Sequence, residues 1–202
     1  RTLVALYFST LCLSSSAADS AAEKPAAPAS GAKPADAVNE HNRWVTGAAF
    51  SPDGALLATV GGESLLYRPG DVLLWNPADG KLKHRLAGHD TSVWAVAFSA
   101  DGTLLAIASA SHAVQTLSVP DCRPLGSYTG HTGEVTSVLF VDGDRRLVTG
   151  GTDCSVRVWD VLTRRTLLAL KPASASVHCV AVSRDLRRLA VATQTGAFVY
   201  SF

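Results

Sequence analysis

The strongest pattern in the chain is an alternation of apolar and polar residues that repeats itself from residue 41 onward. Four stretches align without gaps, and each has an apolar run, a short polar turn and a second apolar run: AAFSPDGALLAT (48–59), AFSADGTLLAI (97–107), LFVDGDRRLVT (139–149) and AVSRDLRRLAV (181–191). The equivalent residues Phe50, Phe98, Phe140 and Val182 are 48, 42 and 42 positions apart. A period near 42 residues with several short strands is typical of β-propeller blades and not of helical solenoids.

Each repeat predicts four short strands. The first is an alternating segment such as 93–98, which is the pattern of a strand with one buried face. A tight turn follows, rich in Asp and Gly, and three further apolar strands come after it, each bounded by turn residues. The strand count predicts an all-β propeller with three complete blades and three strands of a fourth, at about residues 41–86, 87–128, 129–170 and 171–202.

Short motifs within these repeats resemble those of a known family. Gly-His pairs at 88–89 and 130–131 precede the first strand of a repeat, and Val-Trp-Asp at 158–160 ends the third strand of the third repeat. Together with the Ser-Pro-Asp-Gly type of turn, these motifs make residues 41–202 similar to the WD40 repeat. In the third repeat the resemblance implies the hydrogen-bonded tetrad of that family, formed by His131, Thr149, Asp153 and Trp159. An imidazole can bridge a buried carboxylate and a threonine hydroxyl, and an indole N–H can complete the network.

The other repeats depart from this motif. The first has His41, Thr59 and Trp75 but no Asp in register, and it carries a six-residue insertion within 61–71. The second keeps His89 alone, and the fourth has no member of the tetrad. We expect these departures to affect the stability of single blades and not the fold.

The resemblance also implies a complete ring of about seven or eight blades, more than this sequence supplies. A four-bladed piece leaves two open sheet edges, which native proteins avoid. We therefore expect the sequence to be part of a longer propeller. A partner chain that completes the ring and a rare four-bladed closure are the alternatives.

The segment before the repeats has a different character. An apolar run from Leu3 to Leu13 follows Arg1 and precedes small residues, which is typical of a secretory signal peptide. The run is shorter than the roughly 20 residues that span a bilayer, so we expect no membrane span in the mature chain. A buried strand or helix is the alternative. We predict a signal peptide at 1–18, a disordered Ala/Pro-rich linker at 19–40, and a periplasmic or secreted protein.

Charge and motif content narrow the function. A formal charge of +1 gives no support for a nucleic-acid partner. The four cysteines are widely spaced, without the CxxC or CxxCH motifs of zinc or haem sites, and any disulfide among Cys122, Cys154 and Cys179 cannot be paired from sequence. The sequence also contains no GxSxG, HExxH or Walker motif. We therefore expect no catalytic residues, no cofactor and no metal in this segment.

A candidate partner site follows from the resemblance. In that family the side chains that flank a shared valine column, here Val45, Val93, Val135 and Val177, face the top entrance of the central channel. The candidates on this rim are Trp44, Thr46, Trp94, Glu134, Thr136 and His178. Aromatic residues dominate the hot spots of protein interfaces, so we expect a protein or peptide partner. The alternative is that Trp44 and Trp94 plug the channel or pack between blades.

A second patch is predicted on the opposite rim. Seven arginines fall in or beside the turns of the third and fourth repeats: Arg145, Arg146, Arg164, Arg165, Arg184, Arg187 and Arg188. Solvated loop arginines, partly matched by neighbouring Asp residues, are one interpretation. An acidic partner or a membrane surface is the other.

These observations favour a non-catalytic, exported scaffold that binds another protein. One alternative is a propeller segment of a larger exported enzyme or cytochrome-containing protein whose active domain lies outside these residues. Another is a purely structural propeller without a specific ligand. The analogy rests on fold, and propellers host many functions.

Overall fold

A computed structural model of the chain describes residues 41, 44–62, 69–86, 89–171 and 174–201. The signal peptide and linker predicted at 1–18 and 19–40 lie outside these residues, as does most of the predicted insertion, at 63–68. The described residues form four antiparallel sheets. They contain no helix of the length and apolarity that a membrane crossing requires.

Each sheet is a meander in which strands that follow one another in sequence are also neighbours in space. Blade 1 consists of β1 (Trp44–Phe50), β2 (Leu57–Gly62), β3 (Asp71–Asn76) and β4 (Lys81–Leu86). Blade 2 consists of β5 (Val93–Phe98), β6 (Leu104–Ser109), β7 (Ala113–Ser118) and β8 (Pro124–Thr129). Blade 3 consists of β9 (Val135–Val141), β10 (Arg146–Gly151), β11 (Val156–Asp160) and β12 (Thr166–Leu170). Blade 4 has three strands, β13 (Val177–Val182), β14 (Arg188–Thr193) and β15 (Gly196–Ser201).

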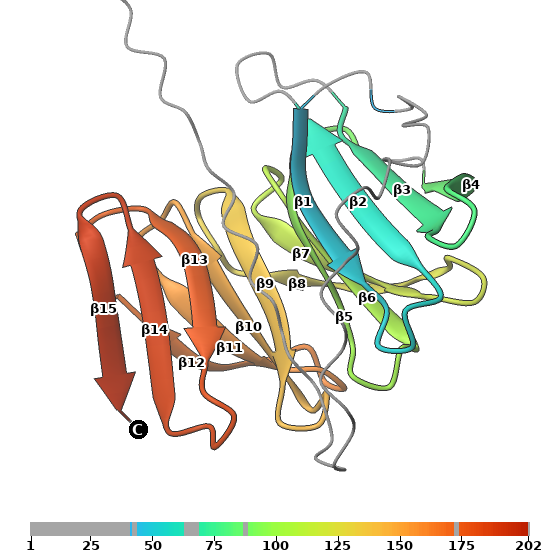
Figure 1. Ribbon diagram of the computed structural model, residues 1–202. Coiled ribbons are helices and arrows are strands. Elements are labelled where there is room, and N and C mark those ends of the chain that lie inside the picture. Colours follow the sequence, from blue (N-terminus) through green and yellow to red (C-terminus); the bar gives the residue numbers. More distant parts are fainter. Residues whose placement is uncertain (1–40, 42–43, 63–68, 87–88, 172–173, 202) are drawn as a thin grey trace, which may run out of the picture.

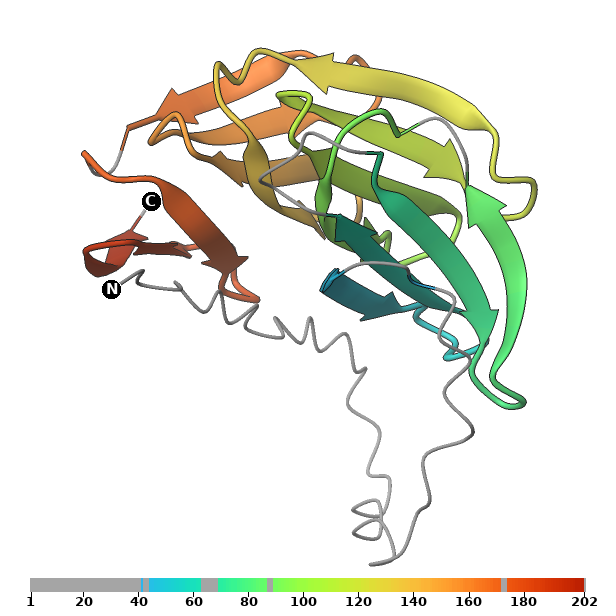
Figure 2. The same cartoon turned by 90° about the horizontal axis from the view of Figure 1, so that it is seen from above.

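The four sheets follow one another around an arc (Figure 2). Their first strands, β1, β5, β9 and β13, contact one another in succession (Figure 1). We call the end at which these first strands begin the upper rim, and the end at which they finish the lower rim. This arrangement confirms the predicted all-β propeller, with three blades of four strands and one of three.

The hydrophobic core lies between the blades and consists of three clusters. One joins blades 1 and 2, the next joins blades 2 and 3, and the last joins blades 3 and 4. The predicted valine column shows this directly, because Val93, Val135 and Val177 are each fully buried against the preceding blade. Val45 is 52% exposed, since no described blade precedes blade 1.

The turns that join the first and second strands share one design in blades 1, 2 and 4. A serine hydroxyl donates to the carboxylate of an Asp two residues later, at 2.6 Å in all three turns. The same carboxylate accepts a backbone N–H two residues beyond it. This Asx-type turn explains why Asp53, Asp101 and Asp185 recur in register. Their repetition therefore serves the fold.

Candidate functional site

The tetrad residues of blade 3 meet in one buried network. The imidazole Nε2 of His131 lies 2.8 Å from the hydroxyl of Thr149, and the indole N–H of Trp159 donates to the same hydroxyl at 2.9 Å. On the other side of the ring, Nδ1 of His131 lies 3.0 Å from the carboxylate of Asp153. The network thus ties the loop before β9 to β10, to β11 and to the turn between them.

The hydrogen bonds determine which atoms carry protons. Because Thr149 accepts from the indole, its own O–H can donate to Nε2 of His131, which leaves Nδ1–H to donate to Asp153. Burial lowers the pKa of His131 and outweighs the opposing attraction of Asp153. Burial alone raises the pKa of Asp153, but bonds from Ser155, the Thr132 N–H and His131 bring it down to about 2. At neutral pH the network therefore holds a neutral imidazole beside a charged carboxylate.

This network is directed inward. Thr149 is fully buried, and the side chains of His131 and Asp153 are only 1% and 7% exposed. The polar side-chain atoms of the four residues bond to one another and to their own blade. The arrangement can fix the position of a loop, which is a structural role.

Blade 1 contains an incomplete version of the same network. His41 and Trp75 both bond the hydroxyl of Thr59, each at 2.7 Å. The sequence alignment finds no Asp in register here, but Asp71 brings a carboxylate oxygen to 3.9 Å from Nδ1 of His41. That nitrogen is buried, and no described residue forms a hydrogen bond with it. Asp71 also pairs with Arg85 at 3.4 Å, so its carboxylate is shared.

Blade 2 replaces the network with apolar packing. Ile107 and Leu117 stand where the threonine and tryptophan would be, and both are buried in the cluster between blades 1 and 2. Ser111 bonds the hydroxyl of Ser109 at 2.7 Å instead of an imidazole. His89 is buried, and burial lowers its pKa. The blade thus keeps its core without the tetrad.

Most of the predicted upper-rim residues lie at a backbone feature that the sequence did not indicate. Four of them occupy the same position after the column valine, where the pairing of the first strand with the second skips one residue: Thr46, Trp94, Thr136 and His178. Such a β-bulge redirects the side chain at the skipped position.

The two threonines use this position to join blades. Thr46 donates its hydroxyl to the carbonyl of Val93 in blade 2 at 2.6 Å, and Thr136 donates to the carbonyl of Val177 in blade 4 at the same distance. Both hydroxyls also lie near a carbonyl of the adjacent strand in their own blade. Their donors are therefore used within the propeller.

The aromatic candidates differ from the threonines. Trp44, at the start of β1, is 66% exposed. Trp94 is half-buried at the bulge of β5, and among the described residues its buried indole N–H has no hydrogen-bond acceptor. The hydroxyl of the neighbouring Ser92 is also buried and has no partner in this part of the chain. Glu134 and His178 are half-buried at the upper ends of blades 3 and 4.

Other chemistry in the described residues is sparse. No group of three or more His, Cys, Asp or Glu side chains there could hold a metal ion. Cys122, Cys154 and Cys179 form no disulfide with one another.

The predicted lower-rim arginines fall in three turns. Arg145 and Arg146 follow the β9–β10 turn, Arg164 and Arg165 lie in the β11–β12 turn, and the other three lie in or after the β13–β14 turn. The first two turns are directly joined, because the N–H of Val161 donates to the carbonyl of Arg145 at 3.0 Å. Arg164 donates to the carbonyl of Leu125 in blade 2.

A family model described as "WD domain, G-beta repeat" matches residues 33–76, 80–115 and 122–160. The second and third matches each begin near the outer strand of one blade, β4 or β8, and end in or at the third strand of the next blade. The repeat in the sequence is therefore offset from the blade in the structure, so that each repeat links two blades. The first match begins at residue 33, within the predicted linker.

Several proteins are similar to this chain. The target of rapamycin complex subunit LST8 of Bos taurus is 29% identical over 147 residues, which cover 72% of this chain and 43% of that protein. Eukaryotic translation initiation factor 3 subunit I of Xenopus tropicalis is 36% identical over 95 residues, covering 46% of this chain and 29% of that protein. The chain thus spans less than half the length of these relatives.

The solved structure of U3-55K has a similar fold, with a TM-score of 0.66 over 80% of this chain and 53% of that one, at 22% sequence identity. At that identity the likeness concerns the fold alone. The family matches together cover more than half of the sequence, in agreement with the blades and the tetrad of the structure. The chain belongs to the WD40 repeat family of β-propellers.

Proposed function

We propose that this chain is a non-catalytic platform that binds a partner protein at its upper rim. Similar proteins support the general role, because LST8 and initiation factor 3 subunit I are by name subunits of larger complexes. A rigid propeller with short turns suits this role, since it presents side chains in fixed positions without rearranging.

The observation that carries the proposal is the state of the two tryptophans at this rim. Trp44 exposes two thirds of a large aromatic side chain at this rim, which is the kind of side chain that anchors protein interfaces. Trp94 occupies the bulge position where Thr46 and Thr136 join blades, but its N–H has no acceptor among the described residues. A buried donor without an acceptor costs about 1–3 kcal/mol. A function at this rim would account for keeping tryptophan at a position that suits threonine.

Polar residues at the same rim would add specificity. Glu134 provides a carboxylate on the loop before β9, and His178 provides an imidazole at the bulge of β13. An aromatic anchor with one carboxylate nearby suits a partner segment that presents an apolar side chain next to a lysine or arginine.

The location of the protein is a second part of the proposal. We propose that residues 1–18 direct export, which would place the platform in the periplasm or outside the cell. Support comes from the apolar run Leu3–Leu13 followed by small residues. Fusing residues 1–40 to alkaline phosphatase, an enzyme that is active only after export, tests it. An inactive fusion that stays in the cytoplasm would refute the export proposal.

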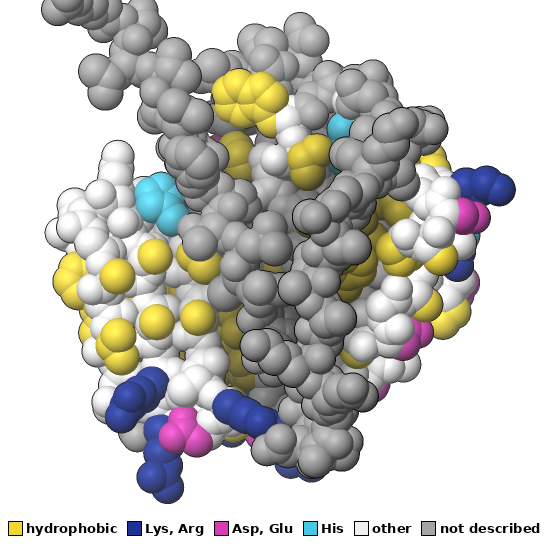
Figure 3. All heavy atoms as spheres, in the orientation of Figure 1, with side chains coloured by type: hydrophobic (Ala, Val, Ile, Leu, Met, Phe, Trp, Pro, Cys, Tyr) yellow, Lys and Arg dark blue, Asp and Glu magenta, His cyan; other side chains and the backbone are white. Residues whose placement is uncertain are grey.

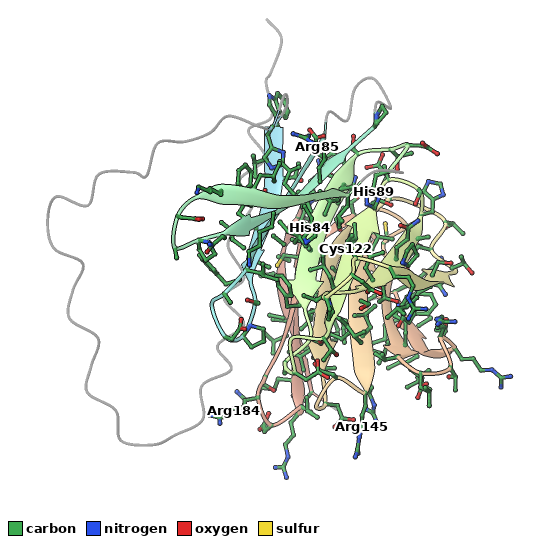
Figure 4. All side chains as sticks on the ribbon, turned by 90° about the vertical axis from the view of Figure 1, so that its right-hand side faces the viewer. His84, Arg85, His89, Cys122, Arg145 and Arg184 are labelled. Atoms are coloured by element: carbon green, nitrogen blue, oxygen red, sulfur yellow. The ribbon has the colours of Figure 1, made fainter. Side chains whose placement is uncertain are left out.

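A photo-crosslinking experiment tests the partner site. Benzoylphenylalanine is placed at Trp44 in the full chain, and in a control chain at His84, which lies on the exposed outer strand β4 (Figure 4). We expect a discrete adduct with one protein from position 44 and none from position 84. Equal adducts from the two positions, or none from either, would overturn the upper-rim site.

The adduct then provides the ligand for a quantitative test. Binding of the identified protein should weaken by about 2 kcal/mol or more in Trp44→Ala, as expected for an interface hot spot. Lys83→Ala, on β4, is the matched control and should bind like the wild type. If Trp44 and Trp94 only pack the propeller, Trp44→Ala will lower the unfolding midpoint and leave the affinity unchanged.

A further inference from the structure

The lower rim of blades 3 and 4 carries more cations than carboxylates, with seven arginines against Asp142, Asp144, Asp160 and Asp185. Arg145, Arg165, Arg187 and Arg188 are all exposed, and none has an ion-pair partner among the described residues. Figure 3 shows Lys and Arg side chains gathered at the lower end of the molecule, beneath β13 and β14. Figure 4 shows Arg145 and Arg184 projecting from this same end.

The nearby carboxylates are already occupied by the fold. Asp142 pairs with Arg146 at 3.3 Å. Asp144 reaches across to blade 2 and accepts the backbone N–H groups of Ala100 and Asp101, at 2.8 and 3.0 Å. Asp160 accepts from the N–H and the hydroxyl of Thr163, and Asp185 is held by its Asx-type turn. These bonds fix the four carboxylates in place, and Asp185 also attracts Arg188. Four carboxylates against the seven arginines of these turns leave this rim with a net positive charge.

The fold itself does not require these arginines. The β1–β2 and β5–β6 turns form the same hydrogen bonds as the β13–β14 turn, but neither contains a cation. At the turns between the third and fourth strands, blades 1 and 2 have one cation each. Lys81, at the start of β4, pairs with Asp79, and Arg123 pairs with Asp121. Among the lower-rim turns, the excess of cations over carboxylates is therefore confined to blades 3 and 4.

Two exposed leucines lie among these arginines. Leu162, in the β11–β12 turn, is 88% exposed, and Leu186, in the β13–β14 turn, is 37% exposed. Leu186 has a φ of 59°, in the left-handed region, where the equivalent residues of blades 1 and 2 are Gly54 and Gly102. A leucine is costly in this conformation, so the turn would be more stable with glycine. The patch is thus both basic and apolar.

We propose that this basic patch, formed by Arg145, Leu162, Arg165, Leu186, Arg187 and Arg188, binds a short acidic segment of a partner protein. The segment would place carboxylates against the guanidinium groups, which bind carboxylates in a fork geometry. Its apolar side chains would cover the two leucines. This surface lies opposite the upper rim and is independent of the function proposed there.

The charges of blades 1 and 2 favour a short acidic segment, and not a long polyanion, as the partner of this patch. Their lower-rim turns contain Asp53, Asp79, Asp101 and Asp121 against only two cations. A nucleic acid or a flat anionic membrane that covered the whole rim would meet these carboxylates and be repelled. A short peptide can stay on blades 3 and 4 and avoid them.

Fluorescence anisotropy with the full chain tests the proposal. The probe is a labelled peptide of alternating glutamate and leucine, and the same peptide with glutamine for glutamate is its control. We expect binding of the glutamate peptide alone, weakening as ionic strength rises. Arg187→Glu with Arg188→Glu should weaken it by about tenfold or more, as expected for two rim charges that become repulsive. Lys81→Glu with Lys83→Glu makes the same charge change on blade 1 and should have little effect.

A further variant distinguishes binding from stability. Leu186→Gly keeps all charges. It should raise the unfolding midpoint and weaken the binding of the peptide by several-fold. Absence of peptide binding at low salt would overturn the proposal, as would equal losses in the two charge-reversal variants. The proposal also fails if double-stranded DNA or phosphatidylserine vesicles bind as tightly as the peptide and with the same dependence on Arg187 and Arg188.

Discussion

The threonine at the centre of the blade 3 tetrad offers the sharpest test of the structure. Thr149 is fully buried, and its one hydroxyl serves two partners. It accepts the indole N–H of Trp159 at 2.9 Å and bonds Nε2 of His131 at 2.8 Å. Thr149→Val keeps the shape of the side chain and removes only the hydroxyl, so that a buried donor and a buried acceptor both lose their partner.

The expected cost follows from these two groups. A buried polar group left without a partner costs about 1–3 kcal/mol, so the two groups together should make Thr149→Val lower the free energy of unfolding by roughly 2–6 kcal/mol if the pocket stays dry. Thr149→Ser keeps the hydroxyl and loses one methyl group, which costs about 1 kcal/mol. The difference between the two variants therefore measures the hydroxyl and not the packing.

Urea unfolding followed by tryptophan fluorescence provides the measurement, with hydrogen exchange of β10 and β11 to locate the effect. Thr59→Val in blade 1 is a second reference, because Nδ1 of His41 already lacks a hydrogen bond there. It should cost less than the same change in blade 3. If Thr149→Val unfolds within about 0.5 kcal/mol of the wild type, or no earlier than Thr149→Ser, the network does not stabilise the blade as argued.

Three other predictions concern pH, close packing and backbone strain. Stability should fall below about pH 6.5, where the unfolded chain protonates His131 before the folded one, and again below about pH 4. Asp153, with its pKa of about 2, should contribute about 2.5 kcal/mol to the second loss. In urea titrations at several pH values, Asp153→Asn should lack this share and keep the rest, which comes from the turn carboxylates whose pKa is also lowered. Gly62→Ala places a Cβ 2.7 Å from the Cα of Ser92 in blade 2. It should lower the melting temperature more than Gly126→Ala, whose Cβ meets the flexible guanidinium group of Arg164. Equal shifts in melting temperature for the two variants would contradict this. Cys154→Gly relieves a φ of 62° and should raise the free energy of unfolding by roughly 0.5 kcal/mol, whereas a lower melting temperature would refute the strain.

The blades could be predicted from the sequence because their information is local. A strand with one buried face, a turn with Asp and a spacing near 42 residues are all visible along the chain. The tetrad of blade 3 follows from the family resemblance, and the structure links its four side chains in a chain of hydrogen bonds from Asp153 through His131 and Thr149 to Trp159. In each case, residues that act together lie at fixed separations in the sequence.

Features that depend on register or on a neighbouring blade could not be predicted. The bulge after the column valine leaves the alternation of the strand almost unchanged, so nothing in the sequence indicated that Thr46 and Thr136 reach the next blade. Asp71 was missed because it follows an insertion, which shifts it away from the position of Asp153 in the alignment. The exposure of Val45 depends on the absence of a described blade before blade 1, which no local pattern reports.

The comparison of blades 2 and 3 indicates what the tetrad contributes beyond stability. Blade 2 is well packed with Ile107 and Leu117 in place of the polar pair, as expected when both partners of a buried hydrogen bond become apolar together. A WD40 blade can therefore form without the network. The network of blade 3 does something that apolar side chains cannot do, because Asp153 also accepts the N–H of Thr132 at 3.0 Å.

That bond holds the loop that leads to the upper rim. The loop is fixed at its other end by the N–H of Thr152, which donates to the carbonyl of Glu134 at 2.9 Å. Glu134 is the carboxylate of the candidate partner site, so the buried network positions a residue at the surface without contacting any ligand. Directed hydrogen bonds specify a loop conformation, whereas apolar contacts specify only proximity. The complete tetrad of blade 3 therefore holds the loop that carries Glu134 in one conformation.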